Sequence, residues 1–534
     1  MRRECKSYAI HLKPATPTMS PATRIFTNTF VSYGRTIVSV LFGMFSVRWV
    51  LAALGNDDYG LYAVVGSLIV FLSFFNSILS ISVARFYAYS LGHEENSQNQ
   101  GTMPQCVNED LRGWFNTALA LHICVPLLLV IVGYPLGEYA VRHWINIPPV
   151  RIAACVWVFR IAVLSAFVNM ASVPFQAMFT ARQLIAELSA VSMVGTVLNF
   201  VAAFFLVYAP IDRLVFYALC MATITAGIPV ILDVWAVCRF RECRLKFQDW
   251  FDFPRLKALL GFSGATTFGF GGYVFASQGN VLLTNHFFGA AVNSAYGIAG
   301  QLAVHTQSLA RSLVDAMSPA ITTLAGRGDV DGTIRLSYRS GKLGSFLLLM
   351  FAIPVALELP EVLQVWLKNP PEFVVPVCRV ILCGLVVSQL TIGHQMAMNA
   401  NGKIFKWQMV EGCALASAVL FACVFAKAGM GPIAAACGYL VALLLSAVGV
   451  VTFCRRTLGM AVGPWLKKVV FPIGVTAAVG LGCGSLVVVG LPPSLMRVAL
   501  TTVVVLLVLG VLGWTRVLDD EEKLFIVRKL LPTT

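Results

Sequence analysis

Arg35 stands inside a long apolar stretch, and polar or small residues recur around it at helical spacing. Steps of three and four place these residues on its face of a helix: Asn28, Ser32, Ser39, Gly43 and Ser46. A guanidinium at mid-membrane costs about 2.5–3.5 kcal/mol on insertion scales. No Asp or Glu lies between Arg24 and Leu54, so we expect a water-filled cavity or an anionic ligand to compensate this charge. The alternatives are an acid on another helix and a side chain that reaches the inner headgroups.

Arg85, in the next apolar segment, is a candidate second cation for the same cavity. Contact with lipid phosphates at the interface is the alternative. Further polar candidates for the cavity lie in the second half of the chain, namely Gln278, Gln307 and Arg311. Asp315 lies one helical turn beyond Arg311, so an internal ion pair or a coupling-ion site is predicted there.

Glu411 is the candidate of the second half for binding Na⁺ or H⁺. Enzyme chemistry is not expected, because no GxxxxGK[ST] loop occurs and no large outside loop could house a glycan polymerase site. The 14 cysteines show no zinc-type spacing, so neither a metal nor another cofactor is expected apart from a coupling ion. No catalytic residue is predicted.

The elements that position these side chains are membrane-spanning helices. The chain is 58% hydrophobic and only 12% charged, which excludes an ordinary soluble protein. About fourteen apolar segments of roughly 17–33 residues are long enough to cross a hydrocarbon core about 30 Å thick. They are Arg24–Leu54, Tyr59–Gly92, Leu111–Val141, Val150–Met178, Leu184–Tyr208, Leu214–Val237, Ala258–Phe288, Asn293–Ala325, Leu343–Leu359, Val375–Ala400, Ile404–Ala426, Ile433–Phe453, Val469–Val489 and Val498–Trp514.

The net charge of +14 follows from the distribution of Lys and Arg along these segments. With Met1 in the cytoplasm, basic residues gather in the inside loops, as in Arg239–Lys257 and Arg327–Lys342, and are sparse outside. This is the positive-inside pattern. It predicts a multi-pass membrane protein with both termini in the cytoplasm, and it explains the charge without nucleic acid.

Two halves of the sequence repeat each other. The repeat pairs Gly55 with Gly289, Tyr62 with Tyr296, Gly66 with Gly300 and Gly92 with Gly326. It also pairs the segment Gln176–Ala181 with Gln395–Ala400. Trp144 and Trp366 each precede a Pro-Pro pair. Internal repetition in a polytopic protein is typical of transporters built from two lobes around a central site.

The repeat divides the chain into six parts. Residues 1–23 are expected to be a disordered cytoplasmic tail, within which Met1 and Met19 are alternative starts. The remaining parts are a six-helix lobe (24–238), a basic linker (239–257), a second six-helix lobe (258–454), two further transmembrane helices (455–517) and an amphipathic tail (518–534).

Several motifs carry a family resemblance. Both halves of the chain contain short motifs that resemble those of polysaccharide transporters. These motifs are Asp58–Tyr62, Val64–Gly66, Arg85-Phe86 and Leu91-Gly92 in the first half, and Phe287–Gly289, Tyr296–Ala299 and Gln364–Leu367 in the second. These transporters are the lipid-linked oligosaccharide (O-antigen type) flippases of the MOP superfamily, which also contains the MATE exporters. The resemblance implies an all-α fold with two pseudo-symmetric six-helix lobes and a central cationic cavity with alternating access. Many relatives carry Arg where this chain has Tyr296.

The function expected from this resemblance is translocation of undecaprenyl-diphosphate-linked oligosaccharide for lipopolysaccharide, capsule or exopolysaccharide synthesis. Guanidinium matches diphosphate in charge and hydrogen-bond geometry, which favours a diphosphate site near Arg35. The expected partners are the lipid-linked oligosaccharide, membrane lipids, a glycan polymerase and other polysaccharide-assembly proteins. The alternatives are a MATE-type multidrug antiporter, which needs acids in the first-lobe cavity, and a non-transporting scaffold of a glycan-assembly complex.

Overall fold

The computed structural model describes residues 21–99, 105–182, 184–245, 250–401, 404–520 and 522–523. Some helical positions lack described side chains, among them 21–33, 35–37, 72–78, 85 and 315. Within the described residues the chain is helical and contains no strand. The α-helices are α1 (Pro21–Asn99), α2 (Gln105–Tyr139), α3 (Ile152–Ala171), α4 (Val173–Ala181), α5 (Ile185–Phe205), α6 (Arg213–Arg239), α7 (Phe253–Phe288), α8 (Ala290–Gly326), α9 (Val330–Leu357), α10 (Leu359–Leu367), α11 (Val374–Asn401), α12 (Ile404–Lys427), α13 (Ala434–Leu458), α14 (Val462–Trp465), α15 (Phe471–Gly490) and α16 (Leu495–Leu512).

Long apolar helices confirm the predicted all-α, multi-pass membrane fold. Within the described residues, 11 helical stretches are long and apolar enough to cross a membrane. The three other expected spans fall on the second half of α1, on α7 and on α8. The backbone of α1 leaves helical geometry at Gly55 (φ 78°, ψ 175°), so α1 consists of two consecutive helices. We refer to these as α1a, before Gly55, and α1b, after it.

One boundary differs from the sequence-based expectation. We expected a basic loop up to Lys342, whereas α9 already begins at Val330. Asp329 caps this helix by accepting a hydrogen bond from the backbone N–H of Gly332 (2.8 Å). The basic residues that suggested a loop are therefore carried by a helix that extends beyond its apolar part.

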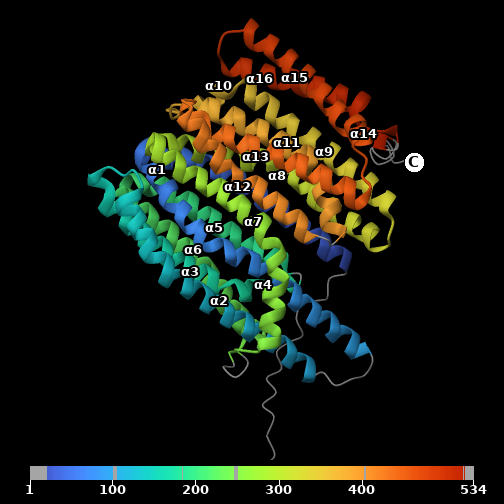
Figure 1. Cartoon of the computed structure of the whole chain (residues 1–534). Helices are drawn as coiled ribbons and strands as arrows, with labels where there is room; N and C mark the ends of the chain where they lie inside the picture. Colours follow the sequence, from blue (N-terminus) through green and yellow to red (C-terminus); the bar gives the residue numbers. More distant parts are fainter. Residues whose placement is uncertain are drawn as a thin grey trace, which may run out of the picture.

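Helices of the two halves pack in corresponding ways. In the first half α5 packs on α1 and α3 packs on α6; in the second half α12 packs on α7 and α11 packs on α13. Figure 1 shows α2–α6 on one side and α8–α13 on the other, with α1 and α7 between them. We call the group α1–α6 the first lobe and the group α7–α13 the second lobe.

The backbone confirms one pair of the sequence repeat. Gly289, between α7 and α8, has φ 83° and ψ 179°, which is nearly the conformation of Gly55. Both glycines lie in the positive-φ region that a side chain disfavours. The two repeat units therefore begin with the same sharp turn between their first and second helices.

The helices α14–α16 form an appendage on the second lobe. Arg497 of α16 pairs with the buried Glu358 next to α10 (2.9 Å). Beyond α16, Glu522 pairs with Lys342 of α9 (3.0 Å). Apolar residues of α9, α15 and α16 pack between these two networks, so the appendage is attached at both of its ends.

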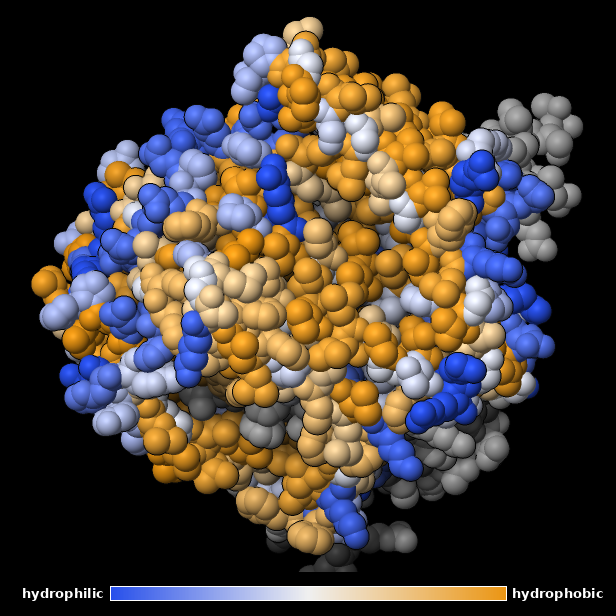
Figure 2. Space-filling view, turned by 45° about the horizontal axis from the view of Figure 1, so that its top comes forward, coloured by the Kyte–Doolittle hydropathy of each residue, from blue (hydrophilic) through white to orange (hydrophobic). Residues whose placement is uncertain are grey.

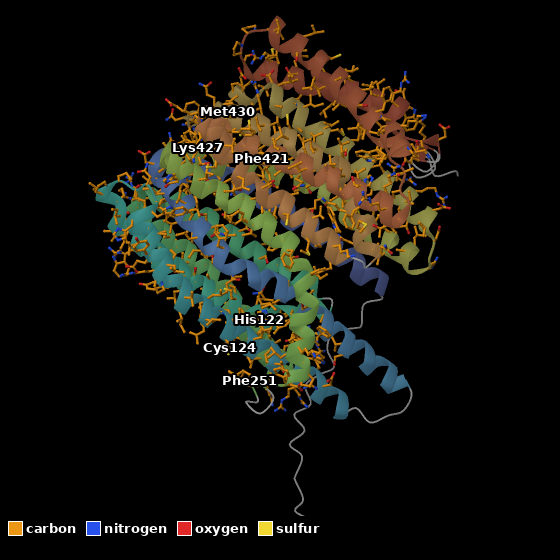
Figure 3. All side chains as sticks on the ribbon, viewed as in Figure 1. His122, Cys124, Phe251, Phe421, Lys427 and Met430 are labelled. Atoms are coloured by element: carbon orange, nitrogen blue, oxygen red, sulfur yellow. The ribbon has the colours of Figure 1, made fainter. Side chains whose placement is uncertain are left out.

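The surface and the ends of the helices fit a membrane-spanning body. Figure 2 shows an apolar area across the middle of the face, with hydrophilic residues gathered at its left and right margins. Figure 3 places Lys427 and Met430 at one end of the molecule and Phe251 at the other. We call the end with Gly55, Gly289 and Met430 the Gly55 end, and the opposite one the Phe251 end.

Candidate functional site between the two lobes

The polar face of α1a is covered from two sides. Ser39 lies 3.5 Å from the Thr196 hydroxyl of α5. One turn closer to the Gly55 end, Gly43 faces the His305 ring of α8, and a Cβ at this position would be in ordinary contact with the ring (3.4 Å). This face therefore points toward the place where the two lobes meet.

Arg35, Asn28 and Ser32 lie further along the same face of α1a, in the direction of the Phe251 end. Their side chains lie outside the described part of the structure, as do those of Arg85 and Asp315. The backbone register still locates Arg35. On the backbone, Arg35 lies one turn from Ser39 toward the Phe251 end, on the same side of α1a.

A polar stripe on α5, which sequence reasoning missed, lies opposite this face. It consists of Ser189, Ser192, Thr196 and Asn199. The Ser189 hydroxyl and the side-chain carbonyl of Asn199 are buried without a hydrogen-bond partner among the described residues. The three-four-three spacing was readable in the sequence. Serine and threonine lower the mean hydropathy of a segment only slightly, however, so a helix that carries them is still classed as apolar.

The structure separates the two predicted clusters of α8 and α1a. Ala295, Ile298 and Leu302 form the α8 face that packs with α1a. At 3.6 residues per turn, Gln307 and Arg311 lie on the opposite side of α8, where Arg311 is exposed. The described contacts therefore do not bring Arg311 to the Ser39 region.

In the second lobe, α7 and α12 meet through glycines. A Cβ on Gly272 would overlap the carbonyl oxygen of Gly412, and one on Gly269 would overlap the Gln408 side chain. Gln278 is half-buried on α7 and donates a hydrogen bond to its neighbour Ser277 (3.2 Å). Tight helix packing through small residues accounts for these contacts.

Glu411 of α12 is half-buried and accepts a hydrogen bond from Gln395 of α11 (3.2 Å). Gln395 belongs to the repeated segment. The donor set at this point is one carboxylate and one amide, which suits a proton or a hard monovalent cation better than a transition metal. Within the described residues, no three His, Cys, Asp or Glu side chains gather as a metal site.

Hydrogen bonds and a ring contact join the lobes at the Gly55 end. Trp366 donates a hydrogen bond to the Met44 carbonyl of α1a (2.5 Å). The backbone N–H of Asn146 donates to the side chain of Asn285 (2.8 Å), and Trp144 stacks on His286. Thus each of the two repeated tryptophans contacts the other lobe.

An ion network holds the same end of the first lobe together. Arg151 pairs with Asp58 of α1b (2.6 Å) and with Asp212, which caps α6. The hydrogen bonds from Arg151 lower the pKa of the Asp212 carboxyl below its usual value. Asp212 is therefore ionised at neutral pH and ties α3 to α6.

At the Phe251 end, α7 connects the lobes. Arg255, near its start, pairs with Asp110 of α2 (2.8 Å), and Leu259 belongs to the core cluster of the first lobe. Further along, α7 packs on α12 of the second lobe. Among the described residues, α1 and α7 thus carry the contacts that join the two lobes.

Comparisons with known proteins agree with this architecture. No protein-family model matches the chain. The chain is 23% identical over 370 residues to the uncharacterized membrane protein EpsK of Bacillus subtilis (strain 168), a match that covers 66% of this chain and 67% of EpsK.

Solved structures of MOP superfamily transporters share the fold. An inward-facing multidrug resistance MATE family transporter matches with a TM-score of 0.66 and 13% identity, covering 81% of this chain and 98% of that one. The lipid II flippase MurJ, in an inward closed conformation, matches with a TM-score of 0.63 and 11% identity, covering 95% and 99%. A MOP superfamily transporter from Pyrococcus furiosus Vc1 matches with a TM-score of 0.56 and 14% identity, covering 82% and 96%. The chain therefore has the fold of this superfamily of membrane transporters.

Proposed function

We propose that the protein is a flippase that moves a lipid-linked oligosaccharide, carried on undecaprenyl diphosphate, across the inner membrane by alternating access. The observation that carries this proposal is the polar, acid-free surface between α1a and α5. It combines the position of Arg35 with the hydroxyl and amide groups of the α5 stripe. Serine, threonine and asparagine suit sugar hydroxyls, and a guanidinium suits a diphosphate.

The contacts that join the lobes fit one state of such a cycle. With both termini in the cytoplasm, as the charge distribution predicts, the Gly55 end faces outward. The Trp366 and Trp144 contacts then join the lobes on the outer side, and the Arg255–Asp110 pair joins them on the inner side. A potential that is negative inside would favour outward movement of an uncompensated anion by about 2.3 kcal/mol per charge per 100 mV.

The fold occurs both in a lipid flippase and in a MATE transporter. The match to the lipid II flippase covers 95% of this chain, whereas the MATE match covers 81%. In the first lobe, Glu187 of α5 is paired with Arg239 (2.6 Å) and is not free to attract a cationic drug. A membrane transporter rather than an enzyme, working beside glycan-assembly proteins, is the role that fits these features.

Replacement of Arg35 tests the proposal in cells that need the flippase for surface glycan. We expect Arg35→Ala to abolish surface glycan and to trap the lipid-linked precursor on the inner leaflet, and Arg35→Lys to retain part of the activity. Arg160→Ala is a matched control, because this arginine pairs with Glu138 on the surface of α3. Normal glycan display with Arg35→Ala would contradict the proposal and favour a scaffold, and new resistance to cationic dyes would favour a drug antiporter.

A further inference from the structure

A carboxylate of the first lobe lacks a cationic partner. Asp233 of α6 is half-buried, and its Oδ2 lies 2.6 Å from the hydroxyl of the buried Ser172. Its Oδ1 is buried without a hydrogen-bond partner. No Lys, Arg or His among the described residues forms an ion pair with it. An ionised carboxylate in this setting loses hydration without full compensation.

The hydrogen bonds at Ser172 accommodate a protonated acid, although the Val168 carbonyl also accepts from the Ser172 backbone N–H (3.1 Å). The Ser172 hydroxyl lies within hydrogen-bond distance of two acceptors, Asp233 and the Val168 carbonyl (3.0 Å). A hydroxyl has a single hydrogen and cannot donate to both. If Asp233 carries a proton on Oδ2, it donates to Ser172, and Ser172 donates to Val168. Each oxygen of this chain then has a partner.

The charged groups around Asp233 are already neutralised by others. Arg239 of α6 pairs with Glu187 of α5 (2.6 Å), and Arg182 beyond α4 pairs with Glu242 (2.9 Å). Burial raises the pKa of the nearby Cys243 thiol to about 12, so this side chain is neutral. From α1, the buried phenol of Tyr87 faces the same core.

The second lobe provides an internal control. Counted from the repeated segments Gln176–Ala181 and Gln395–Ala400, the positions of Ser172 and Asp233 correspond to Thr391 and Thr452. Thr452 is exposed and donates to the carbonyl of its own helix. The helix α11 is continuous at Thr391, whereas in the first lobe α3 ends at Ala171 and α4 begins at Val173, with Pro174 in its first turn. The fold therefore does not require a carboxylate here.

We propose that Asp233 and Ser172 form a proton-binding site at the break between α3 and α4. The Asp233 carboxylate takes up a proton from water at one stage of the transport cycle and releases it at another, and no other bond forms or breaks. Its place in a transport cycle rests on the proposed function, but the protonation does not. The break at Ser172–Pro174 is where a change in hydrogen bonding can alter the angle between two helix segments.

Infrared difference spectra of the purified full-length chain, recorded between acid and alkaline pH, test the site. We expect the carbonyl band of a protonated carboxylic acid to be lost in Asp233→Asn, to shift in Ser172→Ala and to persist in Glu187→Gln. An unchanged spectrum in Asp233→Asn would overturn the proposal. If that variant does not fold, Asp233→Glu and Ser172→Ala must each shift the band, and no shift in either would also overturn it.

The two proposals fail separately. A spectrum of Asp233→Asn that is identical to the wild-type spectrum removes the proton site, but it leaves the glycan phenotype of Arg35→Ala, and with it the flippase, untouched. Normal surface glycan with Arg35→Ala leaves the infrared band intact, so it removes the flippase and not the site.

Discussion

The two lobes use one helix arrangement to make two different interfaces. In the first lobe, α1a and α5 meet through the hydroxyl groups of Ser39 and Thr196 and, closer to the Gly55 end, through aromatic rings such as Phe42 and Phe200. In the second lobe, α7 and α12 meet through glycines and leave no space for a side chain at Gly272. A repeated fold thus keeps polar groups available on one side and fills the equivalent space with backbone on the other. The two lobes can therefore differ in function although their helices are arranged in the same way.

A second contrast concerns the matched tyrosines. Tyr296 donates a hydrogen bond to the Pro432 carbonyl (2.8 Å) and accepts one from the Ala436 N–H (3.0 Å). Tyr62 instead packs against the ring of Tyr217, the residue that corresponds to Ala436. The bulky ring stands where the second lobe has a methyl group. A small cavity of about 70 Å³ borders Tyr62, between α1b, α3 and α6.

The glycine interface offers the most severe test of this contrast. Gly272→Leu places a side chain against the Gly412 backbone, which cannot rotate away, so we expect a loss of more than about 3 kcal/mol of stability. Thermal unfolding in detergent measures the effect. Gly300→Ala is the control, since nothing lies within 4 Å of its Cβ position. Equal melting temperatures for the two variants would show that α7 and α12 are not in close contact.

The ion network that joins the appendage to the second lobe should give the next largest effect. Glu522 and Lys342 are both buried, so Glu522→Ala leaves a buried ammonium with only the exposed Asp519 as a partner. We expect a loss of about 3 kcal/mol, measured by thermal unfolding. Asp520 is fully exposed, and its replacement by Ala should leave the melting temperature unchanged. A similar small effect for both acids would contradict the buried pair.

Removing the phenol groups separates the two tyrosines. Tyr296→Phe leaves a carbonyl and an N–H without their partner, and we expect a loss of about 1–3 kcal/mol. Tyr62→Phe should have a smaller effect, because no hydrogen bond joins its hydroxyl to another described residue. Unfolding of both variants under identical conditions provides the comparison. A larger loss for Tyr62→Phe would reverse the assignment of roles.

The smallest predicted effect concerns Asp212. Asp212→Ala removes the cap of α6 and one partner of Arg151, with an expected loss of about 1 kcal/mol. Because the folded-state pKa of Asp212 is lowered, the stability that its carboxylate contributes is fully present above the unfolded-state pKa of about 3.9. This stability is lost as the pH falls through the folded-state pKa. The difference in melting temperature between variant and wild type should therefore shrink at acid pH. A difference that grows on acidification would exclude this carboxylate as its source.

The sequence predicted the transmembrane helices well, because their apolar length is a property of each segment alone. The repeat also predicted that Gly55 and Gly289 occupy equivalent turns, since positive φ strongly favours glycine. The start of α9 was missed because its basic residues lie on a helix beyond the apolar part. Charge alone does not distinguish such a helix from a loop.

Contacts between distant helices could not be predicted from single segments. The partner of Arg497 is Glu358, far away in the chain, and nothing local identifies it. The α5 stripe was visible as a spacing, but its importance depends on Ser39 lying opposite Thr196. For Arg35, Arg85 and Asp315, the predicted roles remain predictions, because their side chains lie outside the described residues.

The buried acid next to α10 has a consequence for the length of the protein. Among the described residues, the hydrogen bonds to the Glu358 carboxylate come from α16, through the Arg497 guanidinium (2.9 Å) and the Thr501 hydroxyl (2.6 Å). A shortened version that ended after α13 would leave the buried Glu358 carboxylate without its hydrogen-bond donors. Trimming to twelve helices therefore demands a compensating change at position 358, such as Glu358→Leu, and homologues of that size should carry an uncharged residue there.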